Sequence, residues 1–256
     1  MDYLLNAADH LVLDAVYATL FPLATNATTT TTASAFLSSL PRDNDLRIWL
    51  SLFVLVSLGG WIFYFALASV SYFLFYDKEQ MKHPRFLKDQ IKLEIICAST
   101  AIPGFTILTV PFFWLELKGY SRLYEDPAEY GYVYLALSVA MFLFFTDMGI
   151  YFIHRAEHHP SIYKRVHKPH HKWIGEFHLP ILSLACNHLS IIANIYSVYF
   201  QTVPTPFASH AFHPVDGWLQ SLPYHIFPFV FPLHKVLYLI LFVLVNAWTV
   251  MIHDGG

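Results

Sequence analysis

Long uncharged stretches dominate the chain and are separated by shorter segments that carry most of the charge. Residues 48–76 contain no charged side chain, and their length of 29 residues exceeds the ~20 helical residues that cross a hydrocarbon layer. Residues 95–114 form a second apolar stretch, which two prolines interrupt, and residues 131–153 form a third with one acid. The pattern predicts three membrane-spanning helices.

Composition supports lipid as the main solvent. Of the 256 residues, 56% are hydrophobic and 13% are charged, against about half and a quarter in a soluble domain. The net charge of −3 offers nothing to a nucleic acid. Two cysteines are too few for a disulfide framework or a thiolate zinc site. We therefore expect an all-α, polytopic integral membrane protein.

The basic residues orient the predicted helices. Residues 77–94 hold five Lys and Arg, whereas residues 115–130 hold two. The positive-inside rule places the first loop in the cytosol and the second in the lumen. Residues 1–47 are then a lumenal arm, which we expect to be mobile, and everything after residue 153 faces the cytosol. The tripeptide that begins at Asn26 is either a glycosylation site or a chance match.

Histidine is the unusual feature of the composition, with 15 residues, six of them between positions 154 and 171. His154 and His158 are four residues apart and share one helical face, as a pair of metal ligands must. His167, His170 and His171 repeat the spacing of three and four. Crowded imidazoles repel one another when protonated, so their crowding favours neutral rings that bind metal over a solvated loop.

Acidic ligands are scarce near these histidines. Glu157 lies between His154 and His158 in sequence and points away from their shared face. Asp147 precedes His154 by two helical turns on the same face, and an acid within a span is costly unless it serves a site. We take Asp147 as a candidate catalytic residue that handles protons or orients a ligand, with a simple interhelical hydrogen bond as the alternative. Imidazole alone leaves zinc, copper, iron and nickel open.

The ordered motifs closely resemble those of the fungal C-5 sterol desaturases, which belong to the fatty acid hydroxylase superfamily of membrane di-iron enzymes. The motifs are Phe145-Thr-Asp-Met, His154-Arg-x-x-His158-His159-Pro, Tyr163-Lys-Arg-x-His167-Lys-Pro-His170-His171-Lys-Trp-Ile, Pro204-Thr-Pro-Phe-Ala-Ser-His210-Ala-Phe-His213-Pro and Ile252-His253-Asp-Gly. The match extends from about the first span to the end.

The resemblance implies a cytosolic histidine-box di-metal site in an endoplasmic reticulum enzyme. That enzyme would introduce the C5–C6 double bond into a Δ7 sterol in ergosterol synthesis, using O2 and electrons from cytochrome b5 and its reductase. It also implies a set of iron ligands: His154, His158, His167, His170, His171 and, further along, His253. His159, His210 and His213 match the pattern and are weaker candidates.

Two departures from the family pattern lead to further expectations. Residues 175–202 separate two blocks that the family joins almost directly, and we interpret them as a non-native insertion translated from an intron. After His253 the family continues into another His-x-x-His-His box, so at least three expected ligands are missing and activity is expected to be impaired. We therefore divide the chain into the arm at 1–47, the spans at 48–153 and an incomplete catalytic domain at 154–256.

The last apolar run, residues 222–252, must return His253 to the side of the other histidines. A single straight helix fails that requirement, so we expect a bent pair of helices broken near Pro223, Pro228, Pro232 and Lys235.

Other functions remain as alternatives. A catalytically inactive truncated relative, or a fragment of a gene model, would keep the motifs without the reaction. A related sterol or fatty acid hydroxylase shares the histidine boxes. A metal transporter would distribute its ligands through the spans, whereas six histidines here gather at one membrane face.

Overall fold

The computed structural model describes residues 1–23, 38–84, 86–171 and 204–251. The predicted insertion at 175–202, the ligand candidate His253 and the sequon at Asn26 lie outside these residues.

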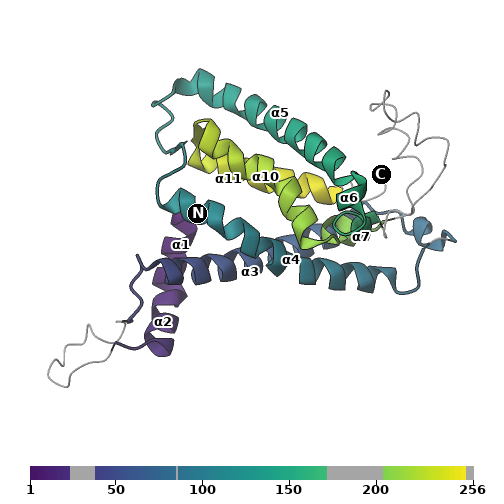
Figure 1. Ribbon diagram of the computed structural model, residues 1–256, viewed down its shortest axis with the longest axis horizontal. Coiled ribbons are helices and arrows are strands. Elements are labelled where there is room, and N and C mark those ends of the chain that lie inside the picture. The colour runs from purple at the N-terminus through teal and green to yellow at the C-terminus, as the bar shows by residue number, and fades with distance from the viewer. Residues whose placement is uncertain (24–37, 85, 172–203, 252–256) are drawn as a thin grey trace.

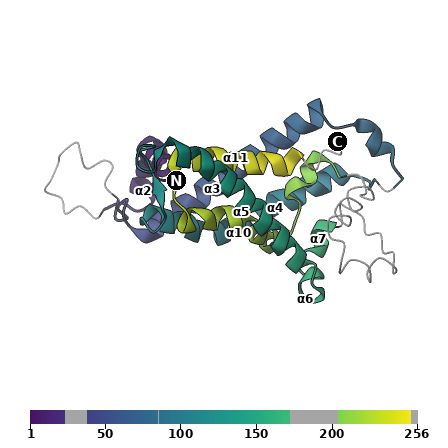
Figure 2. The same cartoon turned by 90° about the horizontal axis from the view of Figure 1, so that it is seen from above.

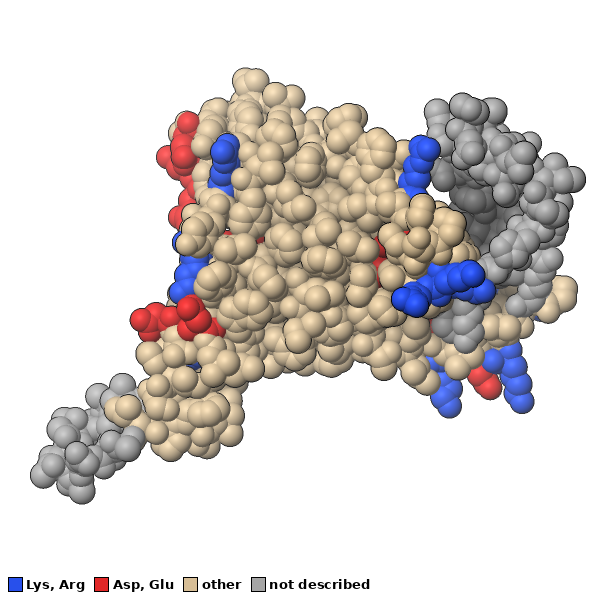
Figure 3. Space-filling model, in the orientation of Figure 1, with Lys and Arg blue, Asp and Glu red and all other residues tan. Residues whose placement is uncertain are grey.

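Three helices form the long axis of the molecule: α3 (Asp45–Leu74), α4 (Gln90–Leu117) and α5 (Gly131–Glu157) (Figure 1). Each is long and apolar enough to cross a membrane. Charged side chains on the face seen in Figure 3 gather toward the two ends and leave a broad, almost uncharged band between them. The prediction of an all-α, multi-pass membrane protein with three spans is confirmed.

The prolines of the second span do not interrupt its helix. Pro103 and Pro111 both lie inside α4, which runs unbroken. A proline in a helix leaves the carbonyl four residues earlier without its N–H donor, here that of Ser99. The indole Nε1 of Trp61 on α3 donates to Ser99 O at 3.0 Å. A neighbouring helix thus satisfies the carbonyl freed by Pro103, which is how such residues are tolerated in lipid.

The last apolar run is a pair of helices, α10 (Pro214–Val230) and α11 (Lys235–Met251), as the requirement for a return predicts. The first begins eight residues earlier than the apolar run, and it contains Pro223 and Pro228 without ending at them. The break falls at residues 231–234, beside Pro232. Lys235 contacts residues at one end of the molecule, while Val250 packs in a cluster at the other, so α11 runs back along α10 (Figures 1 and 2).

The first residues of the chain differ from the expected mobile arm. Residues 2–20 are helical, with α1 (Asp2–Ala8), a π-helical turn η1 (Asp9–Leu13) and α2 (Asp14–Leu20) in succession. Two of their acids face α3: buried Arg47 on this helix makes ion pairs with Asp9 at 2.6 Å and Asp14 at 2.5 Å. These helices are held because a buried guanidinium requires both carboxylates.

Short elements connect the helices. At the end where α3 meets α4 lies a 3-10 turn, η3 (Lys78–Lys82). At the opposite end, β1 (Leu123–Tyr124) pairs in parallel with β2 (Leu233–His234) and joins the loop after α4 to the turn between α10 and α11. Beyond α5 follow two helices of one turn each, α6 (Pro160–Tyr163) and α7 (Lys168–His171).

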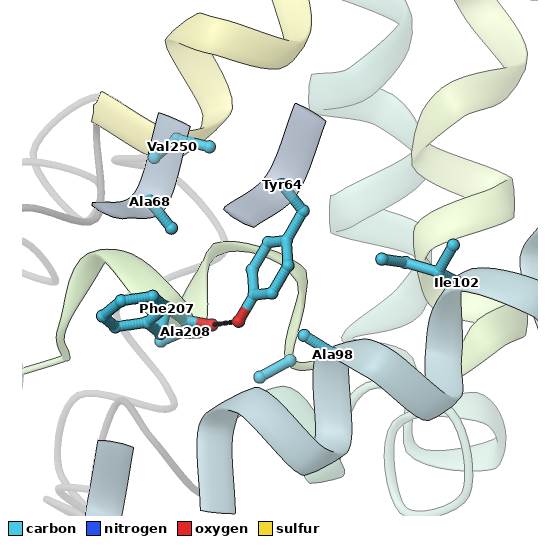
Figure 4. Close-up of a cluster of buried hydrophobic side chains, with 8 residues drawn as sticks. Tyr64, Ala68, Ala98, Ile102, Phe207, Ala208 and Val250 are labelled. Atoms are coloured by element: carbon cyan, nitrogen blue, oxygen red, sulfur yellow. Dashed lines mark hydrogen bonds between the residues drawn. The ribbon is translucent and has the colours of Figure 1, made fainter. Parts of the chain in front are cut away.

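A hydrophobic cluster fixes the segment that precedes α10. The 3-10 turn η4 (Pro206–His210) packs among α3, α4 and the end of α11, and the hydroxyl of Tyr64 donates to Phe207 O at 2.9 Å (Figure 4). Just before η4, the hydroxyl of Thr205 donates to the buried carboxylate of Glu94 on α4. These contacts seat the start of α10 beside the end of α5.

Candidate metal centre

Four histidines from two short stretches of chain form one cluster. His154 lies in the last turn of α5 and His158 is the residue that ends it, while His167 and His171 come from the turn before α7 and from α7 itself. The four ring nitrogens that these residues can offer lie within 4.8 Å of one another. The spacing of four residues aligns the two histidines of each box, and the short chain through α6 brings the two boxes together.

The distances suit a shared ion. The Nε2 atoms of His154 and His158 are 3.1 Å apart. Two nitrogens bound at about 2.05 Å to one ion lie roughly 2.9 to 3.4 Å apart for angles between 90° and 109°. The ring of His167 lies 4.7 Å from that of His154 and 4.7 Å from that of His171, measured between centroids. The pair His154 and His158 is already at ligand spacing.

The surroundings of His158 and His171 favour the neutral form of these two rings. Partial burial and the neighbouring imidazoles lower the pKa of His171 to about 4. The same causes lower the pKa of His158. The Nε2 atoms of His167 and His171 are buried and have no hydrogen-bond partner among the described residues. Neutral imidazoles with free lone pairs are what a transition metal requires, so this donor set fits the iron that the sequence resemblance implies.

A second polar group lies behind His167. The Nδ1–H of His167 donates to Asp216 Oδ2 at 3.0 Å, and Glu157 Oε2 lies 3.8 Å from the same nitrogen. All three side chains are almost completely buried. Burial opposes ionisation of Asp216, but the hydrogen bonds from His167 and Gln220 and the nearby His170 together outweigh it and lower the pKa of this carboxyl.

Sequence reasoning missed this carboxylate pair. Glu157 lies away from the pair formed by His154 and His158, but its carboxylate lies near Nδ1 of His167, on the flank of that ring which faces Asp216. Asp216 is 49 residues from His167 in sequence, so no local spacing could reveal the contact. The available signal was the position of an acid in the first turn after the His210 to His213 motif.

The remaining candidates lie around the cluster. His170 is next to it, with its ring 5.8 Å from that of His167, but is not one of the four clustered residues. His159 and His213 accept backbone N–H groups through Nδ1 and so begin α6 and α10. His210 contacts Ser209 through Nδ1. Asp147 is exposed on α5, two turns before His154. Whether these residues act as ligands or in catalysis stays a prediction.

The fold and this site define a multi-pass, all-α membrane protein with a histidine cluster suited to metal. Comparison with known proteins identifies the family. The chain is 51% identical to mouse lathosterol oxidase over 217 residues, which cover 84% of this chain and 63% of the relative. It is 52% identical to a Delta(7)-sterol 5(6)-desaturase of Candida albicans, covering 86% of this chain and 50% of the relative. Identity to a Delta(7)-sterol 5(6)-desaturase of Schizosaccharomyces pombe is 44%, over 100% of this chain and 70% of the relative.

The chain therefore belongs to the C-5 sterol desaturase family, and the resemblance found in the motifs is confirmed. It spans between half and about two thirds of the length of the relatives it matches. No family model and no solved structure matches it.

Proposed function

We propose that this chain belongs to a membrane oxidoreductase that introduces the C5–C6 double bond into a Δ7 sterol, using O2 and a di-iron site. The single observation that carries the proposal is the cluster of four histidines whose ligand atoms lie within 4.8 Å of one another. The names of the relatives supply the substrate class.

The reaction determines what the site must provide. Desaturation removes two hydrogens from adjacent ring carbons, while O2 takes up these hydrogens, two further electrons and two protons to form two molecules of water. Iron would supply the oxidising power, which no side chain has. His154, His158, His167 and His171 would hold it, with His170, His159 and His253 as further candidate ligands. The two electrons would come from cytochrome b5 and its reductase.

The protein's own contribution is to bind and orient the sterol and to keep the ligands neutral. The apolar helices offer a flat, rigid substrate a route from lipid, since a shallow groove of about 520 Å³ beside His158 is lined by Phe152 and Ile162. We propose that Asp147 handles protons or orients a ligand, that the histidine end faces the cytosol, and that the membrane is the endoplasmic reticulum. In this proposal residues 48–153 anchor the metal-binding part at 154–256.

Expression in a fungal cell that lacks C-5 desaturation tests the proposal. Because the 256 residues span only part of each relative, two versions are compared: the chain alone, and a chimera extended with the segment that follows the matching position in the S. pombe relative. We expect the chimera to convert Δ7 to Δ5,7 sterols, and the chain alone to do so poorly since the resemblance expects further ligands after His253. Sterols are measured by gas chromatography and mass spectrometry.

Controls separate the alternatives. Replacing His158 or His170 with Ala in the chimera is expected to abolish conversion without changing its amount in membranes. Two irons per purified chimera support the enzyme, whereas a folded chimera without metal supports an inactive relative. Unchanged sterols from an iron-loaded chimera refute the substrate assignment and favour a related hydroxylase, whose hydroxylated products the same chromatogram would show.

A further inference from the structure

His167 lies between two groups of side chains. It is one of the four clustered histidines, and its Nδ1–H donates to Asp216 Oδ2 at 3.0 Å. The two nitrogens of an imidazole are on opposite flanks of the ring, and in a neutral ring only one carries a proton. A carboxylate that accepts from Nδ1–H therefore leaves a lone pair on Nε2. That atom is buried and has no hydrogen-bond partner among the described residues.

The carboxylate itself is held firmly. Asp216 lies in the first turn of α10, where the helix dipole favours a negative charge. Gln220, one turn further on, donates through Nε2 to Asp216 Oδ1 at 2.6 Å and to Glu157 Oε2 at 3.2 Å. The backbone there is closely packed, since a Cβ on Gly217 would lie 2.0 Å from the ring of Phe212. The position of Asp216 is thus set by the helix, by an amide and by packing.

The two acids beside His167 are buried. Asp216 and Glu157 are 0% and 1% exposed, and the amide of Gln220 donates to both. A buried carboxylate is costly unless it is hydrogen-bonded, and His167 donates such a bond to Asp216. The carboxylate and the imidazole therefore hold each other in place.

We infer that Asp216 is a positioning residue of the metal centre: it fixes His167 with Nδ1 protonated and Nε2 directed to the cluster. The inference rests on the proposed function insofar as the cluster binds metal, but it concerns a group that the histidine motifs do not include. Asp216 acts through His167 and does not itself bind the metal.

Cobalt(II) binding tests the inference, because its absorption bands report ligand geometry independently of turnover. The purified 256-residue chain in detergent is compared with Asp216→Asn, Asp216→Glu and Gln220→Met. Glu129→Gln is the matched control, since it makes the same change from acid to amide at an exposed loop residue. Affinity is measured by competition with a chelator, stoichiometry by mass spectrometry and folding by size exclusion.

We expect Asp216→Asn to weaken cobalt binding ~10–100-fold, the usual effect of removing a partner of a ligating histidine, with shifted bands and unchanged stoichiometry at saturation. Asp216→Glu should recover part of the affinity because it restores a carboxylate that can accept from His167. Gln220→Met, which releases the carboxylate without removing it, should weaken binding a few-fold, and Glu129→Gln should change nothing.

Several results would overturn the inference. One is an affinity for cobalt within twofold of wild type in folded Asp216→Asn. Another is the loss of one bound ion with the remaining bands unchanged, because Asp216 would then be a ligand. If Asp216→Asn fails to fold, unaltered binding by Gln220→Met decides against the network. A wild-type chain that binds no cobalt would refute the inference together with the proposed metal site, whereas normal binding that Asp216 does not affect leaves the proposed function standing.

Discussion

The contact between Gly149 on α5 and Pro223 on α10 offers a direct test of how helix packing sets the metal centre. A Cβ added at Gly149 would lie 2.6 Å from Pro223 Cγ and 2.7 Å from Pro223 Cβ. Carbon atoms pack best at ~3.5–4.0 Å, so Gly149→Ala must move the two helices apart by about 1 Å. The proline ring is rigid and cannot turn away.

The expected magnitude follows from two opposing effects. Overpacking costs about 1–3 kcal/mol, while exchanging a helical Gly for Ala returns ~1 kcal/mol. The net loss of stability is therefore modest, about 0–2 kcal/mol. The effect on the site is larger, because α5 carries His154 and α10 carries Asp216, and sites tolerate displacements of only ~0.5 Å. We expect Gly149→Ala to remain folded and to lose metal affinity.

Gly59→Ala on α3 is the matched control, since a Cβ there has nothing within 4 Å and the variant gains only helix propensity. Metal content after dialysis against a chelator and thermal unfolding in detergent are measured for both variants and for wild type. By this reasoning, the contact between Gly149 and Pro223 sets the distance between α5 and α10 at the site. This role of the contact would be refuted if Gly149→Ala retained as much metal as Gly59→Ala and had the same melting temperature.

Three further predictions concern other parts of the molecule. A hydrogen bond from Arg42 lowers the pKa of Asp14 to about 2 from 3.8. The ionised Asp14 therefore stabilises the fold fully above pH 3.8, and this stabilisation is lost as the pH falls toward 2. Between these pH values, the melting temperature should fall more steeply in wild type than in Asp14→Asn. Leu11, which is 80% exposed on the side of the N-terminal helices away from buried Asp9 and Arg47, should lie in lipid. A nitroxide label at position 11 should be relaxed more strongly by O2, which concentrates in lipid, than by a water-soluble nickel complex. A label at Glu129 should be relaxed more strongly by the nickel complex. The same ratio of the two relaxation rates at both positions would contradict this orientation. In sealed microsomes, a cysteine at Lys164 should react with an impermeant thiol reagent and one at Glu129 should not, in a chain whose own cysteines are replaced by Ser; protection at Lys164 would reverse the proposed topology.

The parts of the fold that depend on the length of a hydrophobic run or on the spacing of residues along one helix could be predicted from the sequence. Three uncharged stretches predict the three spans, and the spacing of four residues predicts that His154 and His158 share one helical face. The return of the last apolar run could also be inferred, because His253, if it is a ligand as the motifs imply, would have to reach the side of the other histidines. The exact break could not, since Pro223 and Pro228 stay within α10 and only the chain near Pro232 leaves the helix.

What escaped prediction depends on contacts between distant segments. The unbroken α4 relies on Trp61 for the carbonyl of Ser99, a partner 38 residues away. The helical start of the chain relies on Arg47, which turns two acids that look solvated in sequence into buried ion pairs. Asp147 is a reasonable candidate by helical phase, yet the acid in contact with the histidines is Asp216, which reaches them only because α10 packs against α5.

The seating of α10 explains how that carboxylate could serve the proposed metal centre. Two prolines of α10 meet glycines on different spans: a Cβ at Gly104 of α4 would lie 2.6 Å from Pro214, as one at Gly149 of α5 would from Pro223. Missing side chains let helices approach closely, and rigid proline rings fill the space without rotamer freedom. Asp216 lies between these two contacts, so backbone packing from both sides fixes its distance to His167. A carboxylate on a loop could pair with the same imidazole, but its position would relax whenever the metal left. Here the helices keep the acceptor in place, because α10 packs between α4 and α5 when the protein folds. Metal binding then requires no further ordering of this carboxylate.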